Sequence, residues 1–579
     1  MLTRRDLQYR LEALAEQEAN RSAYDGHKPH KVALVYPNTY YVGMSNLGLH
    51  IIYEELNARP DTCCERAFMP ERQEMVAYTK TRTPLMSIES RRPLHQFSII
   101  GIDITFEMDY FNIPILLQMG QVPVLAKDRR TADVFVIGGG PCATFNPEPL
   151  ADFFDAFIIG EGEEITAKAV GCINEGRERG LSRGAILKEL SQLEGVYVPS
   201  LYEVTYNDET HQITRQALAG APDTIKRHWG PLTAGGETVV ATDYTEFGAM
   251  YIVEVARGCG RHCRFCMAGY CYRKPRVRPL HQLKEGVDRA ALLGKKVGLM
   301  GAAISDYPAI DELVAYIRSK NLRYSCASLR ADSLTSDVVK GLAVSGQHTI
   351  TIAPETGSDR LRKVINKGIT EDDLRTSVRM AAAGGIHQIR FYIMVGLPTE
   401  MDEDIEAIID LAKRTRAYME EVGCHGRLTL SINPFIPKPF TPFQWMAMDT
   451  RREVNRKLKG IRKALSKDRQ IEVLIESLKE AYIQAVLARG DRRLGSVLAA
   501  CAKADGSKSF VGLCQEAGID VDQANYRERA FDEELPWDFL DMGLADGYLQ
   551  AEWEKGLQGA YTAPCQDGCQ RCGVCREAR

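Results

Sequence analysis

The stretch VARGCGRHCRFCMAGYCYRKP, residues 255–275, gathers Cys259, Cys263, Cys266 and Cys271 in one short segment. The segment follows a β-rich apolar run, and loops at the carboxyl ends of parallel strands are where α/β proteins place their chemistry. Thiols grouped in this way form disulfides, bind zinc or hold an iron–sulfur cluster. The rest of the sequence has to distinguish between these three uses.

The N-terminus and the cysteine content indicate a reducing compartment. Residues 1–21, MLTRRDLQYRLEALAEQEANR, are heavily charged with helical periodicity, which is not the pattern of a secretory signal. No run of about eighteen uncharged apolar residues indicates a membrane span. In the cytoplasm, clustered thiols more often bind metal or catalyse than form disulfides. We therefore expect a cytoplasmic protein without a membrane partner, and we expect its 16 cysteines not to form disulfides.

Length and charge limit the class of protein further. A chain of 579 residues is too long for one hydrophobic core and suggests about three or four domains. With a net charge of −4, the overall electrostatic field does not indicate nucleic-acid binding, although a local patch could still bind RNA.

The first part of the chain alternates strand and helix signals. Buried apolar runs lie at 30–38, 97–106, 133–142 and 155–164. Helical patterns such as LGLHIIYEELNAR separate them. Parallel strands joined by helices produce this alternation, so residues 25–195 are predicted to form an α/β, doubly wound, Rossmann-like domain after an N-terminal helix at 1–24.

The second part repeats a βα unit. Residues 196–247 form a β-rich connector with short alternating runs. Six strand candidates follow, at 250–256, 296–300, 322–328, 349–353, 387–395 and 427–433. Six units are too few for a closed eight-stranded barrel, so residues 248–446 are predicted to form a partial (β/α)6 barrel. Residues 447–579 are expected to be a mainly helical C-terminal region.

The spacing of the loop cysteines favours an iron–sulfur cluster. Three thiolates, Cys259, Cys263 and Cys266, cannot fill the four coordination places of a four-iron cluster, which leaves one iron open for another ligand. Zinc sites more often use paired Cys or His knuckles with a long spacer, but His262 could supply a fourth zinc ligand. Cys271 falls outside the triplet and is expected to be a structural thiol.

In this context the CxxxCx(aromatic)C pattern, with Phe265 as the aromatic residue, resembles the radical S-adenosylmethionine superfamily. The resemblance implies a 4Fe-4S cluster whose open iron binds the amino and carboxylate groups of S-adenosylmethionine. It also implies an electron donor such as flavodoxin or ferredoxin, and cleavage of S-adenosylmethionine to a 5′-deoxyadenosyl radical.

Further turns of the barrel carry the same resemblance. TIAPETGSDRLRKVINKG (351–368), RFYIMVGLPTEMDEDI (390–405) and CASLRADSL (326–334) are similar to the family's cofactor-binding turns. MGAAISDYP departs from the family's Gly-Gly-Glu after the second strand. The residues that the resemblance assigns to S-adenosylmethionine are Phe265, from the cysteine motif, and, from these turns, Gly301, Ala302, Ser328, Arg330, Glu355, Gly357, Gly396, Leu397, Pro398 and Glu400.

The N-terminal domain resembles the cobalamin-binding-type domain found in one subgroup of that superfamily. Gly138, Gly139 and Gly140 follow a strand and would let a ligand approach the backbone. The Asp-x-His-x-x-Gly signature is absent, and its nearest match is Asn38, Tyr40 and Gly43. The glycines could therefore either contact cobalamin or only form a tight turn. His50, on the following helix, is expected to be packed or at the surface.

The C-terminal region contains two further candidate sites. Cys565, Cys569, Cys572 and Cys575 could complete a second iron–sulfur cluster with no open iron, or an all-cysteine zinc site. Arg489, Arg492 and Arg493 form a charged turn, with an RNA phosphate contact as the alternative.

Together these features predict a radical S-adenosylmethionine enzyme that acts on an unknown substrate. Bound cobalamin would favour methyl transfer. One alternative is an RNA-modifying enzyme that resembles radical methylthiotransferases. Another is a redox or cobalamin sensor that does not catalyse a reaction.

Overall fold

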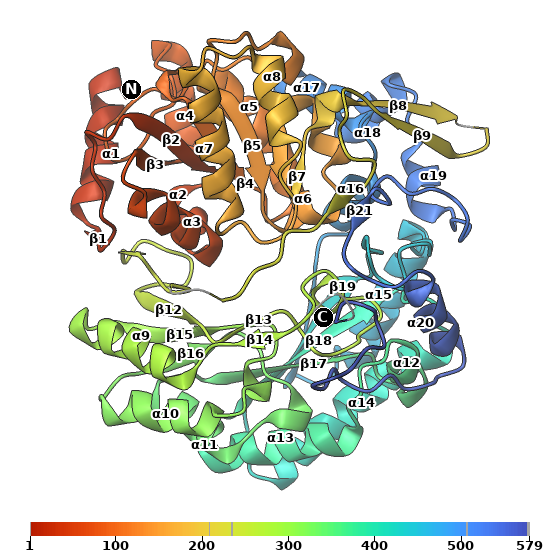
Figure 1. Cartoon of the computed structure of the whole chain (residues 1–579). Helices are drawn as coiled ribbons and strands as arrows, with labels where there is room; N and C mark the ends of the chain where they lie inside the picture. Colours follow the sequence, from red (N-terminus) through yellow and green to blue (C-terminus); the bar gives the residue numbers. More distant parts are fainter. Residues whose placement is uncertain (1, 208, 233–234, 505–507, 576–579) are drawn as a thin grey trace. The chain divides into compact units, whose positions relative to one another are not determined.

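The computed structural model describes residues 2–207, 209–232, 235–504 and 508–575. The chain divides into two compact units (Figure 1). The first comprises residues 1–249, 486–524 and 532–543, and the second comprises 250–485, 525–531 and 544–579. The C-terminal region, predicted as one helical piece, is therefore shared between both units.

The first unit is built on a six-stranded sheet in the order β3-β2-β4-β5-β6-β7. All neighbours are parallel except β6 and β7. The strands are β2 His30–Tyr36, β3 Thr62–Phe68, β4 Ile99–Asp103, β5 Phe135–Gly139, β6 Ala156–Ile158 and β7 Val196–Tyr197. The predicted doubly wound sheet is confirmed, with two strands added. One is the short edge strand β7. The other is β3, whose sequence TCCERAF is fully buried although it carries two charges.

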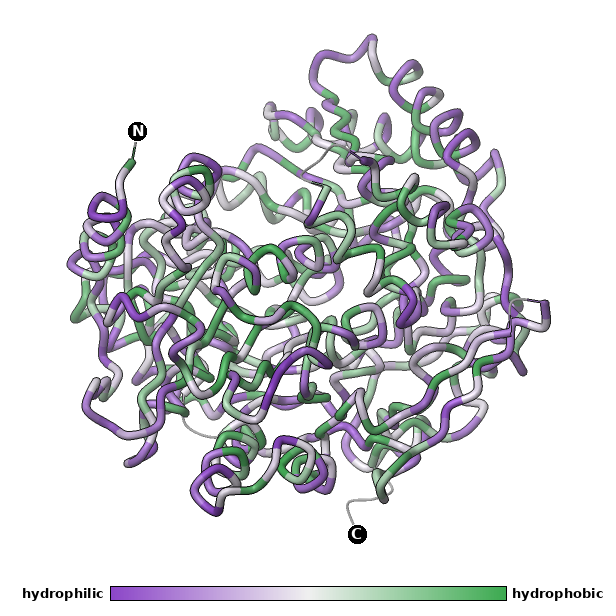
Figure 2. The backbone as a smooth tube through the Cα atoms, turned by 90° about the horizontal axis from the view of Figure 1, so that it is seen from above, coloured by the Kyte–Doolittle hydropathy of each residue, from purple (hydrophilic) through white to green (hydrophobic). Residues whose placement is uncertain are grey.

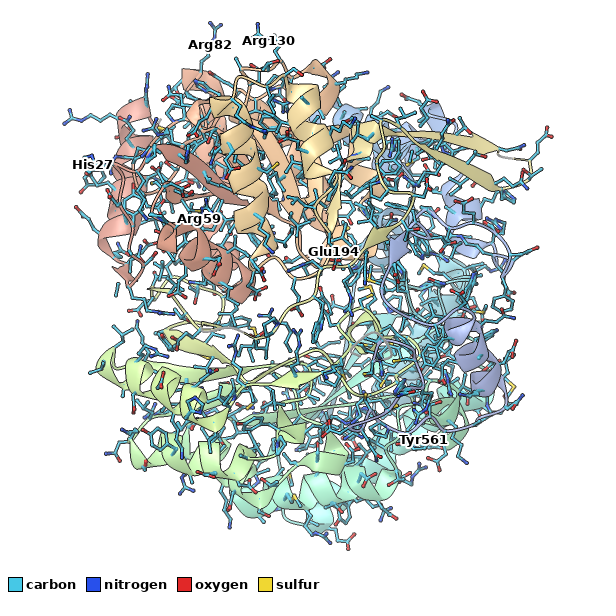
Figure 3. All side chains as sticks on the ribbon, in the orientation of Figure 1. His27, Arg59, Arg82, Arg130, Glu194 and Tyr561 are labelled. Atoms are coloured by element: carbon cyan, nitrogen blue, oxygen red, sulfur yellow. The ribbon has the colours of Figure 1, made fainter. Side chains whose placement is uncertain are left out.

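Helices cover both faces of this sheet. On one face, α3 (Leu47–Ala58), α7 (Ile165–Glu178) and α8 (Arg183–Leu190) share a core with the strands. Val35 and Ile102 of the opposite face are equally buried, as a parallel sheet covered on both sides requires. On the outside, Arg82 and Arg130 extend away from the ribbon (Figure 3).

The remaining segments of the first unit are helices and short strand pairs. The predicted connector joins this unit through small sheets: β8 pairs with β9, β10 with β21, and β11 with β1. The bounds are α1 Arg4–Glu16, α2 Tyr40–Gly43, α4 Arg72–Thr81, α5 Asn112–Met119, α6 Pro141–Phe145, α17 Leu494–Ala504, α18 Phe510–Glu516, β1 Ala19–Asn20, β8 Tyr202–Asn207, β9 Gln212–Ala217, β10 Ile225–Lys226, β11 Val240–Ala241 and β21 Leu540–Asp541.

The second unit contains seven parallel strands. One sheet has the order β12-β15-β16 and the other β17-β18-β19-β20, and a bridge between Leu329 and Ile352 links them. The strands are β12 Met250–Glu254, β15 Lys296–Met300, β16 Tyr324–Cys326, β17 Thr349–Glu355, β18 Gln388–Val395, β19 Leu428–Pro434 and β20 Ile471–Ile475. The six predicted strands are present. β20 extends the sheet into the region predicted to be helical.

Helices pack on the outer face of these strands (Figure 1), where they share one hydrophobic core. The opposite face is more polar: along β18, buried Phe391 alternates with half-buried Arg390 and exposed Tyr392. The helices are α9 Leu280–Leu292, α10 Ile310–Ser319, α11 Ser336–Val344, α12 Asp359–Val364, α13 Glu371–Gly384, α14 Asp402–Glu421, α15 Arg451–Leu465 and α20 Tyr548–Leu557. Helices α16 Leu478–Arg489 and α19 Val521–Tyr526 each cross a boundary between the units.

Hydropathy follows this layering. Hydrophobic segments run through the interior and hydrophilic turns lie outside (Figure 2). Among the described residues, no helix is both long and apolar enough to cross a membrane.

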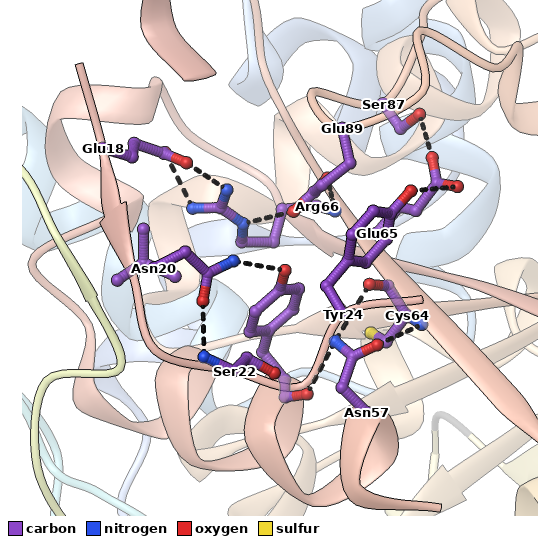
Figure 4. A network of polar contacts seen from close by, with 12 residues as sticks. Glu18, Asn20, Ser22, Tyr24, Asn57, Cys64, Glu65, Arg66, Ser87 and Glu89 are labelled. Atoms are coloured by element: carbon purple, nitrogen blue, oxygen red, sulfur yellow. Dashed lines mark hydrogen bonds and ion pairs between the residues drawn. The ribbon is translucent and has the colours of Figure 1, made fainter. Parts of the chain in front are cut away.

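A buried ion-pair network fixes the N-terminal segment to the first sheet (Figure 4). Arg66 of β3 is 2% exposed and lies between Glu18, at 2.6 Å, and Glu89, at 2.8 Å. Its guanidinium also lies over the Tyr53 ring, 5.1 Å from the centroid. Removing one partner of a buried ion pair leaves an uncompensated charge, so this network depends on the arginine.

Arg66→Met should therefore lower the free energy of unfolding of the first unit by about 3–5 kcal/mol, because two buried carboxylates lose their counter-ion. Denaturant unfolding of the full chain would measure this. The exposed pair of Arg10 and Glu74 provides the control, since Arg10→Ala should cost less than about 1 kcal/mol. Similar losses from both variants would contradict the assigned role.

Candidate functional site

The cysteine segment forms a closed loop at the carboxyl end of β12. Two residues on each side, β13 (Ala256–Arg257) and β14 (Arg276–Val277), pair antiparallel and close it. Gly258 has a φ of +79°, and a Cβ there would lie 2.0 Å from the Tyr272 carbonyl oxygen. The neck of the loop therefore requires glycine at this position.

The three predicted ligand thiols lie within electrostatic range of one another. Burial, followed by the Cys263 and Cys259 thiols, raises the pKa of Cys266 to about 12. Burial is also the main cause of the raised pKa of Cys259. Across the described residues, no three Cys, His, Asp or Glu side chains are arranged to hold a metal ion. The case for an iron–sulfur cluster therefore depends on the type of donor. Cysteine thiolates are the ligands that hold such clusters, and this loop supplies three cysteines.

Cationic side chains face the loop. Lys367, which follows α12, lies 2.7 Å from Glu355 through its Nζ, and 6.0 Å from the centroid of the Phe265 ring. Burial lowers the pKa of Lys367, but Glu355 and Cys263 outweigh it and raise the pKa overall. Arg330 donates from Nη2 to the Lys367 carbonyl oxygen at 3.3 Å. Lys367 was not predicted, because a single lysine in an ordinary turn carries no sequence signal.

The predicted arginine already has an acidic partner. Arg330 pairs with Asp332 at 2.9 Å, and Asp332 also pairs with Arg261 at 3.0 Å. Arg261 in turn pairs with Asp306 at 2.9 Å. A ligand carboxylate at Arg330 would therefore have to share the guanidinium with this network.

Several other predicted contacts are engaged in packing. Glu400 accepts from the Gly396 N–H at 2.9 Å and pairs with Lys457 at 2.8 Å, so it supports the 396–400 turn from within. A Cβ at Gly357 would lie 2.2 Å from the Ala407 carbonyl carbon of α14. Of the other predicted residues, Leu397 is buried, Gly301 and Pro398 are half-buried, and Ala302 and Ser328 are exposed.

His262 is not available as a zinc ligand. Its Nε2 lies 3.0 Å from Arg273 Nη1, and its Nδ1 lies 2.8 Å from the Tyr548 hydroxyl. Because arginine only donates, Nε2 accepts and Nδ1 carries the proton, which it donates to Tyr548. Burial and then Arg273 lower the pKa of His262 to about 3. Both ring nitrogens are thus used, which removes the fourth ligand that kept zinc open for this loop.

Two of the three glycines at the edge of the first sheet are packed against the protein's own side chains. A Cβ at Gly138 would lie 2.6 Å from the Phe157 ring, and one at Gly140 would lie 2.5 Å from Asp103. Gly139 alone has open space beside it. The protein's own packing therefore requires glycine at 138 and 140, and only Gly139 leaves space beside the backbone. Binding of cobalamin at these glycines stays a prediction.

The loop after β2 is likewise engaged within the protein. Asn38 donates from Nδ2 to Asp109 at 2.8 Å, and Tyr40 donates to Glu18 at 2.7 Å. A Cβ at Gly43 would lie 2.5 Å from the Phe68 ring. His50 is packed as expected: its Nδ1 accepts from the Val239 N–H at 3.3 Å.

The charged turn near residue 490 is largely internal. Arg492 lies 3.3 Å from Glu148 and donates to the Tyr197 hydroxyl at 2.7 Å. Arg489 is 2% exposed and donates to the Ala524 carbonyl oxygen at 3.0 Å. These two side chains hold the first unit together and do not form a surface for RNA phosphates. This corrects the expected solvated turn.

Two carboxylates lie near the switch point of this sheet, between β2 and β4. Oδ2 of Asp103 is buried without a hydrogen-bond partner, and Asp109 is bonded by Asn38. Burial, with a smaller contribution from Asp109, raises the pKa of Asp103 to about 7, and burial raises the pKa of Asp109 to about 6. The folded state thus keeps a proton that the unfolded chain has lost.

This difference predicts a pH-dependent stability. As pH rises from about 4 to about 7, the Asp103 carboxyl should reduce the stability of the folded state, because the unfolded carboxyl ionises first. Asp103→Asn should therefore stabilise the protein more at pH 8 than at pH 5, by about 2 kcal/mol. Thermal unfolding at both pH values would measure it. Asp128→Asn, at an exposed position, controls for the lost charge, and a gain independent of pH would refute the explanation.

Comparisons with known proteins match two family descriptions in order along the chain. Residues 48–199 match "Radical SAM proteins, N-terminal", and residues 253–412 match "Radical SAM superfamily". An uncharacterized protein of Methanocaldococcus jannaschii is 32% identical over 473 residues, which are 81% of this chain and 90% of that protein.

More distant similarities cover less. A tRNA-2-methylthio-N(6)-dimethylallyladenosine synthase of Aquifex aeolicus is 24% identical, over 42% of this chain and 55% of that enzyme. Among solved structures, the methyltransferase TsrM from Kitasatospora setae is similar with a TM-score of 0.45 and 14% identity, over 69% of this chain and 72% of that one. The chain thus spans nearly all of its archaeal relative and about half of the tRNA enzyme.

Proposed function

Because this chain belongs to the radical S-adenosylmethionine superfamily, we propose that it is an enzyme that holds a 4Fe-4S cluster on Cys259, Cys263 and Cys266. The observation that carries the proposal is the loop itself. Three thiols lie on one closed loop at the carboxyl end of β12, and a buried lysine faces them. Four-iron clusters are held by cysteine thiolates, and three of them leave one iron without a protein ligand.

When bound, this cluster supplies an electron for the reductive cleavage of S-adenosylmethionine, and so a radical that acts on the substrate. The electron would come from an external donor such as flavodoxin or ferredoxin. The protein's part is to position the cofactor and exclude water.

The charged groups around the loop suit an amino-acid ligand. Lys367 and Arg330 provide positive charge for a carboxylate, and Glu355 provides negative charge for an amino group. Because Glu355 and Lys367 pair with each other at 2.7 Å, they are held in place before a ligand arrives. Binding would exchange this pair for contacts with the ligand.

Cobalamin is not part of the proposal. The packing of Phe157 and Asp103 against Gly138 and Gly140 gives no positive support for it, so no step is assigned to that cofactor. Methyl transfer through it is accordingly not proposed.

Anaerobic turnover tests the proposal. Reconstituted, reduced protein mixed with S-adenosylmethionine should yield 5′-deoxyadenosine and methionine. The C259S/C263S/C266S variant should lose this product and about four iron atoms per chain. Liquid chromatography with mass detection and an iron assay would measure both.

Cys271→Ala is the matched control, because this thiol belongs to the same loop but lies outside the triplet. It should keep the iron and the activity. An intact cluster in wild type with no cleavage would support the sensor alternative. Unchanged iron in the triple variant would refute the ligand assignment.

RNA modification is the second candidate function. It is favoured by the similarity to the tRNA-modifying enzyme of Aquifex aeolicus. In this hypothesis, the RNA base would lie against the polar face of the strands, which carries Arg390 and Tyr392. Adding unmodified tRNA to the turnover assay should then increase 5′-deoxyadenosine formation and add mass to a nucleoside. Base-specific mass change with tRNA, and none with a control peptide mixture, would support it. No mass change in the tRNA would refute it.

A further inference from the structure

The C-terminal segment of the chain lies directly against the cysteine loop. The Cys565 N–H donates to the Gly260 carbonyl oxygen at 2.7 Å. A Cβ added to Gly260 would lie 3.5 Å from the Cβ of Cys565. Because Gly260 follows Cys259 and consecutive Cα atoms are 3.8 Å apart, the Cα atoms of Cys259 and Cys565 lie within roughly 10 Å of each other. The two cysteine groups of the sequence are therefore neighbours in space.

Buried polar contacts hold the segment in this position. Asn366 donates from Nδ2 to the His262 carbonyl oxygen at 3.0 Å and to the Thr562 carbonyl oxygen at 2.9 Å. The Thr562 N–H returns a hydrogen bond to Asn366 at 2.9 Å. The Thr562 hydroxyl donates to Glu552 of α20 at 2.8 Å. The segment is thus docked by paired groups, as buried polar atoms require.

A second set of contacts comes from the loop side. Arg264 is completely buried and donates to the Ala560 carbonyl oxygen at 2.8 Å. Nearer the chain end, Tyr561 packs over Gly368, and Figure 3 labels its side chain. The loop and the segment therefore form one continuous structure.

The four tail cysteines fold back on themselves. Gly568 and Gly573 have φ values of +79° and +93°, which allow tight turns between the cysteines. Cys572 is 3% exposed, and its carbonyl oxygen accepts from the Ala545 N–H at 2.8 Å. The Cys569 N–H donates to the Gln566 carbonyl oxygen at 3.0 Å, and the Gly573 N–H donates to the Gln570 carbonyl oxygen at 3.3 Å.

One side of the tail group faces solvent, whereas the loop group is more enclosed. Gln566, Asp567 and Arg571 between the tail cysteines are exposed. Each group contains one buried thiol, since Cys263 is 8% exposed and Cys572 is 3% exposed. The residues between the loop cysteines are buried or half-buried, so a protein that docks on the surface would meet the tail segment more easily than the loop.

We propose that Cys565, Cys569, Cys572 and Cys575 hold a second iron–sulfur cluster that relays electrons to the cluster on Cys259, Cys263 and Cys266. This rests on the proposed function, since the relay needs a catalytic cluster to receive the electron. Four thiolates fill every protein-ligand place of a four-iron cluster, which leaves no iron open for a substrate and suits electron transfer. Zinc would bind thiolates equally well, but it has no redox chemistry and cannot relay.

The electron balance is simple. A one-electron donor, either a reduced flavin or an iron–sulfur protein, is oxidised as the tail cluster gains one electron. The tail cluster is then reoxidised as the loop cluster gains that electron. No covalent bond forms or breaks in either transfer, and no proton is required.

The first test uses metal content in the full chain, reconstituted anaerobically. Wild type should bind about eight iron atoms, from two four-iron clusters. C259S/C263S/C266S should keep about four, held by the tail, and C569S/C572S should keep about four, held by the loop. C172A/C501A removes two half-buried cysteines elsewhere and should change nothing. One zinc ion with about four irons in wild type would overturn the proposal.

The second test separates relay from structure. With dithionite, a small reductant that reaches the loop cluster directly, C569S/C572S should cleave S-adenosylmethionine within about twofold of wild type. With reduced flavodoxin, the same variant should be slower by about tenfold or more. Equal losses with both reductants, or no loss with either, would overturn the relay.

A third measurement needs no variant. In wild type mixed with reduced flavodoxin and freeze-quenched, electron paramagnetic resonance should show the tail cluster reduced before the loop cluster. Simultaneous or reversed reduction would overturn the relay. If the triple variant keeps all of its iron, the proposed function fails instead. A tail cluster that is reducible in an iron-depleted loop variant still supports the second site.

Discussion

The Arg264 guanidinium is the interaction on which the candidate site depends. It is fully buried, and a buried cation is costly unless it is paired and hydrogen-bonded. Both terminal nitrogens have partners, whereas Nε has none. Its partners are the Lys363 and Val364 carbonyl oxygens at 2.9 Å, the Ala560 carbonyl oxygen, and Glu552 at 3.4 Å. These groups belong to α12 and to the C-terminal segment around α20. One side chain therefore joins three parts of the second unit that are far apart in sequence. The cysteine loop has almost no regular secondary structure, so its position follows from this pairing.

The first unit contains both a buried charge that is fully paired and a buried carboxylate that is not. Arg66 is paired on both sides by carboxylates, and it connects the N-terminal segment to the sheet. Asp103, at the end of β4, keeps one oxygen buried without a partner. Buried unpaired polar atoms are rare because each one costs stability. At the edge where parallel sheets usually bind ligands, the Asp103 carboxylate lies against Gly140, and Phe157 lies against Gly138.

Much of the fold could be predicted from the sequence, because the spacing of apolar residues along the chain indicates which residues are buried. Six of the seven parallel strands of the second unit and four of the six strands of the first sheet were found by their apolar runs. β3, β7 and β20 were not. TCCERAF of β3 carries charges that are paired only in the folded state, β7 is two residues long, and IEVLI of β20 lies in a charged, helix-like context. The cysteine spacing located the loop. Lys367, Asn366 and the docking of Cys565 on Gly260 could not be predicted, since each depends on contacts between distant segments. The sequence also did not show why glycine is needed at two predicted positions: a side chain at Gly138 would collide with Phe157, and one at Gly357 with the backbone of α14.

The docking of the C-terminal segment also has a consequence for the order of biosynthesis. Arg264 emerges from the ribosome almost 300 residues before Glu552 and Ala560, which complete its hydrogen bonds. Until those residues are synthesised, the Arg264 guanidinium cannot make these hydrogen bonds, and the docked form of the loop cannot be complete. Iron delivery to a nascent chain would therefore reach an unfinished loop, and maturation of the enzyme is expected to be a post-translational event.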